Sequence, residues 1–188
     1  WAPWARPPPK AEVGVAVQRY IPDSVTFSSA MDRDTPLKPP LSNLMKIFIF
    51  DLFVGHVDRH AGNIVVEGRS PHRAWAIDNE NIFGSNYRIA SISSVARGNT
   101  LTRHVANRTI PASIKRKLAD ITWADFRTAA AGIPLIALKR AWLRREVILG
   151  WDKIPGLDEM QGDWGAESGT DDEINAAFAE LHQKEGLS

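Results

Sequence analysis

The first half of the chain has three patterns of apolar and polar positions that predict regular structure. Residues 13–21 (VGVAVQRYI) alternate and are rich in Val, which predicts a strand. Residues 41–55 (LSNLMKIFIFDLFVG) are apolar on nearly every side and end at Gly, which predicts a buried helix. Two short apolar runs, NIVVE and RAWAID, are joined by GRSPH and predict a β-hairpin. Residues 22–40 are rich in Pro, Ser and Asp and predict a loop.

The second half has the patterns of helices. Residues 114–121 predict a short basic helix, and residues 122–132 predict a helix with a Thr N-cap and a Gly stop. Residues 170–186 begin with Thr and Glu at the spacing of a capping box, which predicts an amphipathic helix. Residues 134–151 predict an amphipathic helix with an apolar stripe on one side and Arg and Lys on the opposite, solvent-facing side. The stripe is formed by Leu135, Leu138, Trp142 and Leu149.

Composition limits the class of protein. A chain of 188 residues with 44% apolar residues and seven Trp suits one domain or one large lobe with a real core. The absence of Cys excludes disulfides and thiolate metal sites and favours a reducing, cytoplasmic setting. The net charge of +1 gives no global attraction to nucleic acid, and no apolar run has transmembrane length.

Charge is unevenly distributed along the chain. Residues 97–145 are mostly basic, which indicates solvated helix faces or, in a second interpretation, a site for an anionic acceptor. Residues 152–173 are mostly acidic.

The chain lacks an initiator Met and opens with a Pro-rich segment, so we expect a fragment of a longer protein. We divide it into an extended segment with a hinge strand (1–22), a main unit (23–151) and an acidic linker with a final helix (152–188).

The residues with the strongest chemical signal lie between the buried helix and the hairpin. In the loop GHVDRHAGN, Asp58 and Asn63 are five residues apart, and Asp78 directly follows the second strand of the hairpin. Phosphoryl transfer to a hydroxyl needs a carboxylate near the acceptor and oxygen ligands for Mg²⁺. These three residues supply that set, and their spacing follows the general kinase pattern of Asp, four residues, Asn, then a later Asp.

The segment VDRHAGNIVV followed by WAIDNENIF resembles the catalytic and metal motifs of the phosphatidylinositol 3- and 4-kinase-like superfamily, above all its bacterial HipA-like branch. The resemblance is specific over residues 47–83. It implies an α+β fold, namely a protein-kinase-like C-terminal lobe that is mostly helical with a short catalytic hairpin and a hinge strand. It also implies ATP and Mg²⁺ as cofactors and transfer of the γ-phosphate to a hydroxyl, first of a protein Ser/Thr and second of a lipid or small molecule.

The resemblance assigns a role to each matching residue. Asp58 is expected to orient or deprotonate the acceptor hydroxyl, and His60 to stabilise the transferring phosphoryl group or assist proton transfer. Arg59 is expected to brace the loop through a carboxylate. Asn63 and Asp78 are expected to hold Mg²⁺.

Residues 13–24 are similar to the hinge that lines the adenine pocket, so the resemblance assigns nucleotide contacts to Val17, Gln18, Tyr20 and Ile77. Two features depart from the family. DNEN replaces the usual Asp-x-Gly motif, and Glu80 adds negative charge beside the expected metal site. In addition, nothing before Val13 supplies a phosphate-covering loop or a strand Lys. Either the rest of a parent chain supplies an N-lobe, or the protein is a non-catalytic pseudokinase or nucleotide-binding regulatory module.

Two other kinds of site compete for the same residues. A zinc site is one alternative, because His56 and His60 are four residues apart. The flanking glycines favour a loop over the helix that this spacing suits. The ligands of such a site would be His56, His60, His72 and Asp78. A hydrolytic triad has weaker support because Ser91, Ser93 and Ser94 lack a G-x-S-x-G context.

Two polar residues near the loop are expected to have structural roles. Asp51 lies within an apolar helix, so we expect it to be buried and paired with Arg59 or His60. We expect His56 to pack or to hydrogen-bond to the loop backbone.

Overall fold

The computed structural model describes residues 21–32, 37–79, 82–83, 92–156, 158–159 and 169–185, and its fold is α+β. The described strands form one antiparallel sheet in the order β1 (Ser24–Thr26), β2 (Ile64–Glu67), β3 (Ala74–Ala76). The described helices are, in chain order, α1 (Phe27–Met31), α2 (Leu41–Val54), the 3₁₀ helix η1 (Ala61–Asn63), α3 (Ile92–Gly98), α4 (Thr102–Val105), α5 (Ala112–Ala119), α6 (Trp123–Ala129), α7 (Leu135–Leu149) and α8 (Asp171–Glu185). Within these residues, none of the helices combines the length and the apolar character needed to cross a membrane.

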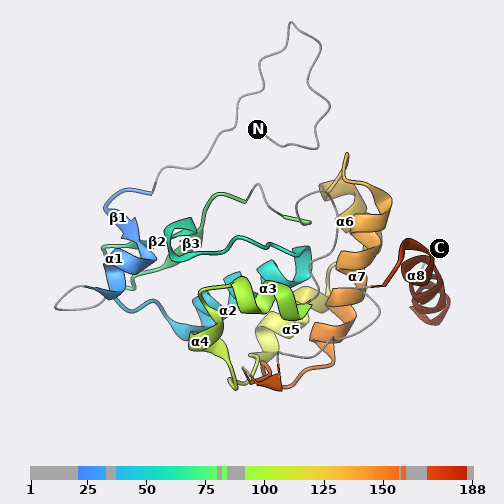
Figure 1. Ribbon diagram of the computed structural model, residues 1–188. Helices are drawn as coiled ribbons and strands as arrows, with labels where there is room; N and C mark the ends of the chain where they lie inside the picture. Colours follow the sequence, from blue (N-terminus) through green and yellow to red (C-terminus); the bar gives the residue numbers. More distant parts are fainter. Residues whose placement is uncertain are drawn as a thin grey trace, which may run out of the picture.

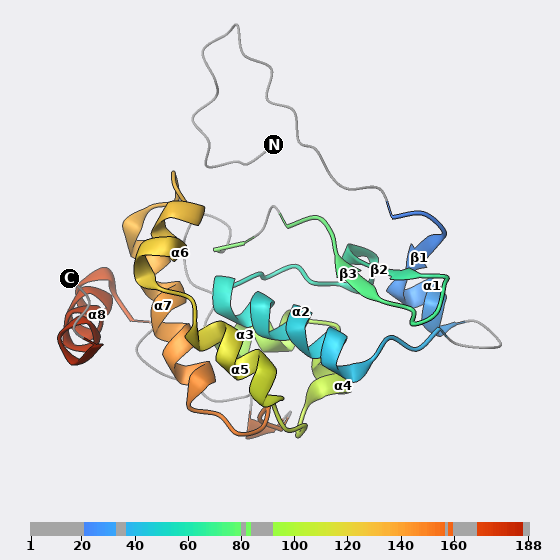
Figure 2. The same cartoon turned by 180° about the vertical axis from the view of Figure 1, so that it is seen from behind.

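The sheet and the C-terminal helices lie at opposite ends of the molecule, and α2 lies between them (Figures 1 and 2). The sheet and α1 occupy one end, whereas α6, α7 and α8 occupy the other. Helix α2 contacts α3, α4, α7 and β3, so it is the central element of the core. This position explains why its sequence is apolar on nearly every side.

Helix α2 confirms the prediction of a buried helix over residues 41–55. It ends where Gly55 adopts a left-handed conformation with φ of 71°. The amide N–H of His56 donates to the carbonyl of Asp51 at 2.8 Å, which satisfies a carbonyl at the end of the helix. This turn directs the chain away from α2 and begins the polar loop.

The predicted hairpin is also present. Strands β2 and β3 pair with Ile64 opposite Ala76 and Val66 opposite Ala74. Ile64 and Val66 are fully buried, so this face of the hairpin packs into the core. The side chain of Asn43, in the first turn of α2, accepts a hydrogen bond from the amide of Ala74 at 2.6 Å and fixes the hairpin to the helix.

Part of the segment that we predicted as a loop is regular structure. Residues 22–40 contain β1, which pairs with β2 through Val25 and Val66, and α1, whose first turn is capped by Thr26. The strand is only three residues long and depends on a partner about 40 positions away, so local composition did not predict it. Of the strand expected at residues 13–21, all but Ile21 lies outside the described residues, including Val17, Gln18 and Tyr20.

The prediction that the basic residues of residues 134–151 face solvent is wrong for the three arginines. Arg140, Arg144 and Arg145 of α7 are all buried, whereas Leu135 from the predicted apolar stripe is 49% exposed. Each guanidinium reaches a neighbouring element instead of water, and each contact uses backbone carbonyl oxygens that the sequence pattern does not identify.

The three arginines fix the ends of three other helices. Arg144 donates from Nε to the carbonyl of Phe53 at the end of α2, at 3.0 Å. Arg145 donates to the carbonyls of Leu118 and Ala119 at the end of α5. Arg140 pairs with Asp171 at the start of α8 and also donates to a carbonyl just before that helix. For Arg144 and Arg145 the position is favourable because the last carbonyls of a helix have no partner within it, whereas Arg140 is held by the Asp171 carboxylate.

An aromatic cluster joins α6, α7 and α8. The ring centroids of Trp123 and Trp142 are 5.3 Å apart, and those of Trp123 and Phe178 are 4.7 Å apart. Helix α8 begins with the predicted capping box, in which Glu173 accepts from the amide of Thr170 and its own amide donates to the Thr170 hydroxyl. The final helix is therefore held by aromatic packing as well as by the Arg140 ion pair.

Replacement of Gly55 tests whether the turn after α2 depends on both its conformation and its contact with Arg144. A Cβ at position 55 would lie 2.8 Å from Arg144 Nη2, in a residue whose positive φ already disfavours a side chain. We expect Gly55→Ala to lower the free energy of unfolding by about 2–5 kcal/mol in urea denaturation.

The matched control is Gly132→Ala. Gly132 has φ of 92° but a Cβ there would meet no heavy atom within 4 Å, so this variant carries the conformational cost alone. An equal loss of stability in the two variants would show that contact with Arg144 does not matter.

Candidate functional site

The polar loop between α2 and the hairpin places alternate side chains in the core and at the surface. Arg59 is fully buried, whereas its neighbours Asp58 and His60 are exposed. The loop therefore holds itself to the core through one residue and presents the residues on either side to solvent. This is how a rigid scaffold positions reactive groups on a connecting segment.

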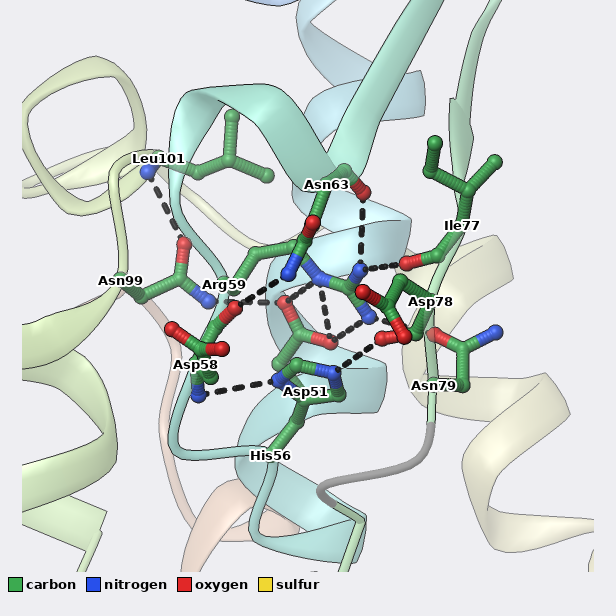
Figure 3. Close-up of polar contacts among 10 residues, drawn as sticks. All are labelled: Asp51, His56, Asp58, Arg59, Asn63, Ile77, Asp78, Asn79, Asn99 and Leu101. Atoms are coloured by element: carbon green, nitrogen blue, oxygen red, sulfur yellow. Dashed lines mark hydrogen bonds and ion pairs between the residues drawn. The ribbon is translucent and has the colours of Figure 1, made fainter. Parts of the chain in front are cut away.

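A buried ion pair between Asp51 and Arg59 lies at the centre of the site (Figure 3). Arg59 donates from Nη2 to Asp51 Oδ1 at 2.9 Å and from Nε to Oδ2 at 3.0 Å, and both side chains are 0% exposed. This confirms that Asp51 is buried and paired, and it identifies Arg59 as the partner. The two-point contact fixes the guanidinium plane relative to α2.

The same guanidinium joins the loop to the end of the hairpin. Arg59 Nη1 donates to the carbonyl of Asn63 at 2.9 Å and to that of Ile77 at 2.7 Å, and Nη2 donates to Asn79 Oδ1 at 2.6 Å. One side chain thus contacts α2, the end of the loop and the segment after β3. Arg59 thus makes the carboxylate contact that its expected role, bracing the loop, requires.

Asn99 is a part of this network that sequence analysis missed. Its Nδ2 donates to Asp51 Oδ2 at 2.8 Å, and its Oδ1 accepts from the amide of Leu101 at 2.9 Å. Asn99 is 4% exposed and links the segment between α3 and α4 to the ion pair (Figure 3). Nothing in the sequence connects it to Asp51, because the two residues are 48 positions apart.

His56 connects the residues expected to be catalytic and metal-binding. Its Nδ1 accepts from the amide of Asp58 at 3.2 Å, and its Nε2 lies 3.2 Å from the carbonyl oxygen of Asp78. An acceptor at Nδ1 and a donor at Nε2 require the neutral tautomer with the proton on Nε2. The prediction that His56 bonds to the loop backbone is confirmed, and the bonds reach both sides of the site.

Asp58, Asn63 and Asp78 belong to one connected set of hydrogen bonds. Asn63 Nδ2 donates to the carbonyl of Asp58 at 2.9 Å, and the amide of Ile77 donates to the carbonyl of Asn63 at 3.0 Å. Asp78 follows Ile77 and is also joined to His56. In Figure 3 the side chain of Asn63 lies between those of Asp58 and Asp78. The fold therefore brings the three residues to one place, although they come from the loop and from the segment after β3.

The backbone at Asp78 has an unusual conformation. Its φ is 52°, a left-handed value that Asp and Asn adopt more readily than other residues with a Cβ. Both Asp78 and the following Asn79 are exposed. Asp23, His72, Phe83 and Asn107 also have a positive φ, so this conformation alone does not mark Asp78 as functional.

His60 is held by its own loop. Its Nδ1 accepts from the amide of Gly62 at 3.0 Å, which caps the start of η1. The ring is exposed, and this bond leaves Nε2 to carry the proton. His60 therefore presents a possible donor at the surface next to Asp58.

Burial shifts the pKa values of two groups in the network. Desolvation raises the pKa of Asp51, against the opposing effects of Arg59, His56 and Asn99. Desolvation lowers the pKa of His56, and the charge of Arg59 lowers it further, which keeps the imidazole neutral. Neutral His56 is the form that its two hydrogen bonds require.

The zinc interpretation is not supported by the geometry. Both ring nitrogens of His56 are engaged by backbone groups, and Nδ1 of His72 lies 3.1 Å from the carbonyl oxygen of Glu67. In the part of the chain that the structure describes, no three His, Asp or Glu side chains gather as metal ligands. Of the serines in the triad interpretation, Ser94 is exposed on α3, and Ser91 lies outside the described residues.

Of the residues expected to contact the nucleotide, only Ile77 is described. It is partly buried, and both its amide and its carbonyl are used, by Asn63 and Arg59 respectively.

Comparison of the chain with models of known protein families, with curated proteins and with solved structures gives no match.

Replacement of Arg59 tests whether the ion pair organises the site. Arg59→Met leaves the Asp51 carboxylate buried without its cation, so we expect a loss of about 3–5 kcal/mol in the free energy of unfolding. Denaturation in urea followed by tryptophan fluorescence measures this loss.

Arg69→Met is the matched control because Arg69 pairs with Asp23 at the same distance of 2.9 Å but is 83% exposed. We expect this variant to lose at most about 1 kcal/mol. Comparable losses in the two variants would contradict the central role of Arg59.

The pKa of His56 predicts how stability depends on pH. The unfolded chain binds a proton at the ordinary value of 6.5, whereas folded His56 binds it only at a lower pH. The free energy of unfolding should therefore fall as the pH drops below 6.5 and level off below the folded pKa. Urea denaturation from pH 7.5 down to acid should show a shallower fall in His56→Asn than in the natural chain.

His104 contributes a slope of the same sign, because burial and then Arg103 lower its pKa as well. The double variant with His104→Asn should consequently be flatter than His56→Asn alone. A His56→Asn variant that keeps the whole slope of the natural chain would show that His56 is not the responsible group.

Proposed function

We propose that this chain is an ATP- and Mg²⁺-dependent phosphotransferase of the phosphatidylinositol 3-/4-kinase-like type, with the fold of a kinase C-terminal lobe. The observation that carries the proposal is the contact of Arg59 with both Asn63 and Ile77. It supports the proposal because it holds the loop bearing Asp58 and Asn63 against the segment that bears Asp78. Those are the residues that the motif spacing selects.

The donor set fits Mg²⁺. This ion prefers oxygen ligands, and Asn63 and Asp78 offer amide and carboxylate oxygens. Because Asn63 Nδ2 is committed to the carbonyl of Asp58, its Oδ1 is the atom left to bind a cation. When bound, Mg²⁺ would neutralise charge on the nucleotide phosphates.

Asp58 is proposed to receive the acceptor hydroxyl. It is exposed, and its backbone is fixed on both sides, since its amide donates to His56 and its carbonyl accepts from Asn63. A carboxylate so held can accept a hydrogen bond from the hydroxyl and take its proton as the phosphoryl group arrives. The oxygen of the hydroxyl then forms the new bond to phosphorus, while the bond to the ADP oxygen breaks.

His60 and Arg59 are proposed to act in different ways. His60 is exposed and can donate from Nε2 to a phosphoryl oxygen as negative charge develops on it. Arg59 is completely buried, so it is a positioning residue and not a group that touches substrate.

As the acceptor of the phosphoryl group we propose first a Ser or Thr of a protein, and second a lipid or small-molecule hydroxyl.

Nucleotide binding and transfer can be separated by two substitutions. Asp78→Ala should abolish the Mg²⁺-dependent increase in melting temperature that ATP produces, because it removes the oxygen ligands of this side chain. Asp58→Asn should retain that increase but lower the rate of phosphoryl transfer by about 10²- to 10⁴-fold, because it removes the base. The measurements are thermal denaturation with ATP, with and without Mg²⁺, and transfer of labelled γ-phosphate to a mixed protein acceptor.

Asp120→Asn is the matched control, because Asp120 is an exposed carboxylate beyond the end of α5 and far along the chain from the loop. It should change neither measurement. Nucleotide binding without transfer in the natural chain would favour the non-catalytic module. No effect of ATP on a folded chain would overturn the proposal.

A further inference from the structure

An apolar cavity of about 230 Å³ opens between α2 and α5. Its walls are formed by Ile49, Phe50 and Phe53 of α2 and by Ile114 and Leu118 of α5. Phe50 is 42% exposed, so part of the lining faces solvent. The lining is thus apolar and accessible from solvent.

This cavity is separate from the polar site. A helix turns by about 100° per residue, so the three apolar residues of α2 that line the cavity share one face. Asp51 lies about 150° around the helix from the centre of that face, where it meets Arg59. Helix α2 therefore stands between the two, with its polar contact on one side and the cavity on the other.

Two lysines stand at the cavity, one on each wall. Lys46 belongs to α2 and Lys117 to α5, and both are exposed. Among the described residues that line the cavity there is no acidic side chain. An anion attached to an apolar group would have two favourable contacts here. Its charge would be attracted to the two lysines, and its apolar part would be buried in the cavity.

We propose that this cavity binds an anionic amphiphile, specifically a medium-chain carboxylate whose tail enters the cavity and whose head lies between Lys46 and Lys117. The size is suitable, because apolar cavities of about 150 Å³ lined by Leu, Ile and Phe already hold a benzene ring. A protein partner would need a specific interface of more than about 1,000 Å², whereas the apolar lining here is confined to two helices and to Ile121, just after α5. The inference does not depend on phosphoryl transfer.

The experiment is a titration of the chain with decanoate, below the concentration at which it forms micelles, followed by methyl NMR. Signals of Ile49, Ile114 and Ile121, which line the cavity, should shift with saturation. The signal of Ile64, which is fully buried in β2, should not shift. Decanol, the uncharged analogue, should produce the same pattern at higher concentration.

The double variant Lys46→Gln with Lys117→Gln tests the role of charge. This variant should lower the affinity for decanoate about 3- to 10-fold, as expected for two exposed ion pairs, and leave the affinity for decanol unchanged. The matched control is Lys38→Gln with Lys184→Gln, which removes two other exposed lysines and should leave both affinities unchanged. Phe50→Ala should lower the affinity for both ligands, because it removes apolar lining and not charge.

The possible results distinguish the alternatives. Absence of saturable shifts in the three cavity isoleucines would overturn the proposal, as would equal loss of decanoate affinity in the two lysine double variants. Binding of an acidic peptide with a single Leu at the same isoleucines, where decanoate fails, would assign the cavity to a protein partner instead.

Discussion

The arrangement of the polar loop depends on one buried interaction, the ion pair between Asp51 and Arg59. Removing two charges from water has a large cost, so such a pair adds little net stability to the fold compared with apolar residues of similar size. Its effect is geometric. Asp51 belongs to the central helix, and the Arg59 guanidinium has enough donors to reach that carboxylate, the carbonyls of Asn63 and Ile77, and Asn79 at the same time. A lysine has one charged centre and no planar array of donors, and could not make this set of contacts.

Buried arginines are also the means by which α7 holds its neighbours. Arg144 and Arg145 donate to carbonyls at the ends of α2 and α5, where the last turn of a helix leaves acceptors without partners. In each case the guanidinium donates to backbone oxygen, and that of Arg145 also pairs with Glu146, so a charged side chain is buried with hydrogen bonds and not against apolar surface alone. The turn that begins the polar loop is accordingly fixed from two sides, by Arg144 beneath Gly55 and by Arg59 within the loop.

The sequence predicted the features that local physics determines. The continuous apolar run of α2, the hairpin and the capping box of α8 all have short-range signals, and a lone carboxylate within α2 required a partner such as Arg59. Three features depend on distant partners and were not predicted. Strand β1 is defined by pairing with β2, Asn99 by its bond to Asp51, and the buried state of the α7 arginines by the positions of other helix ends. Composition alone places arginine in solvent, because it contains no information about where unpaired carbonyls will lie.

Helix α2 relates the polar site to the apolar cavity. Its Asp51 side is fixed by Arg59 and Asn99, while its opposite side lines the cavity through Phe50 and Phe53. The carbonyl of Phe53 is the group that Arg144 holds, and the same guanidinium lies against Gly55, where the loop begins. A displacement of Phe53 by an occupant of the cavity would therefore act on the Arg144 contact before it reached the loop. Asp58, Asn63 and Asp78 are tied to the helix through Arg59 and His56, so the contacts that fix the end of α2 continue into those that fix the loop.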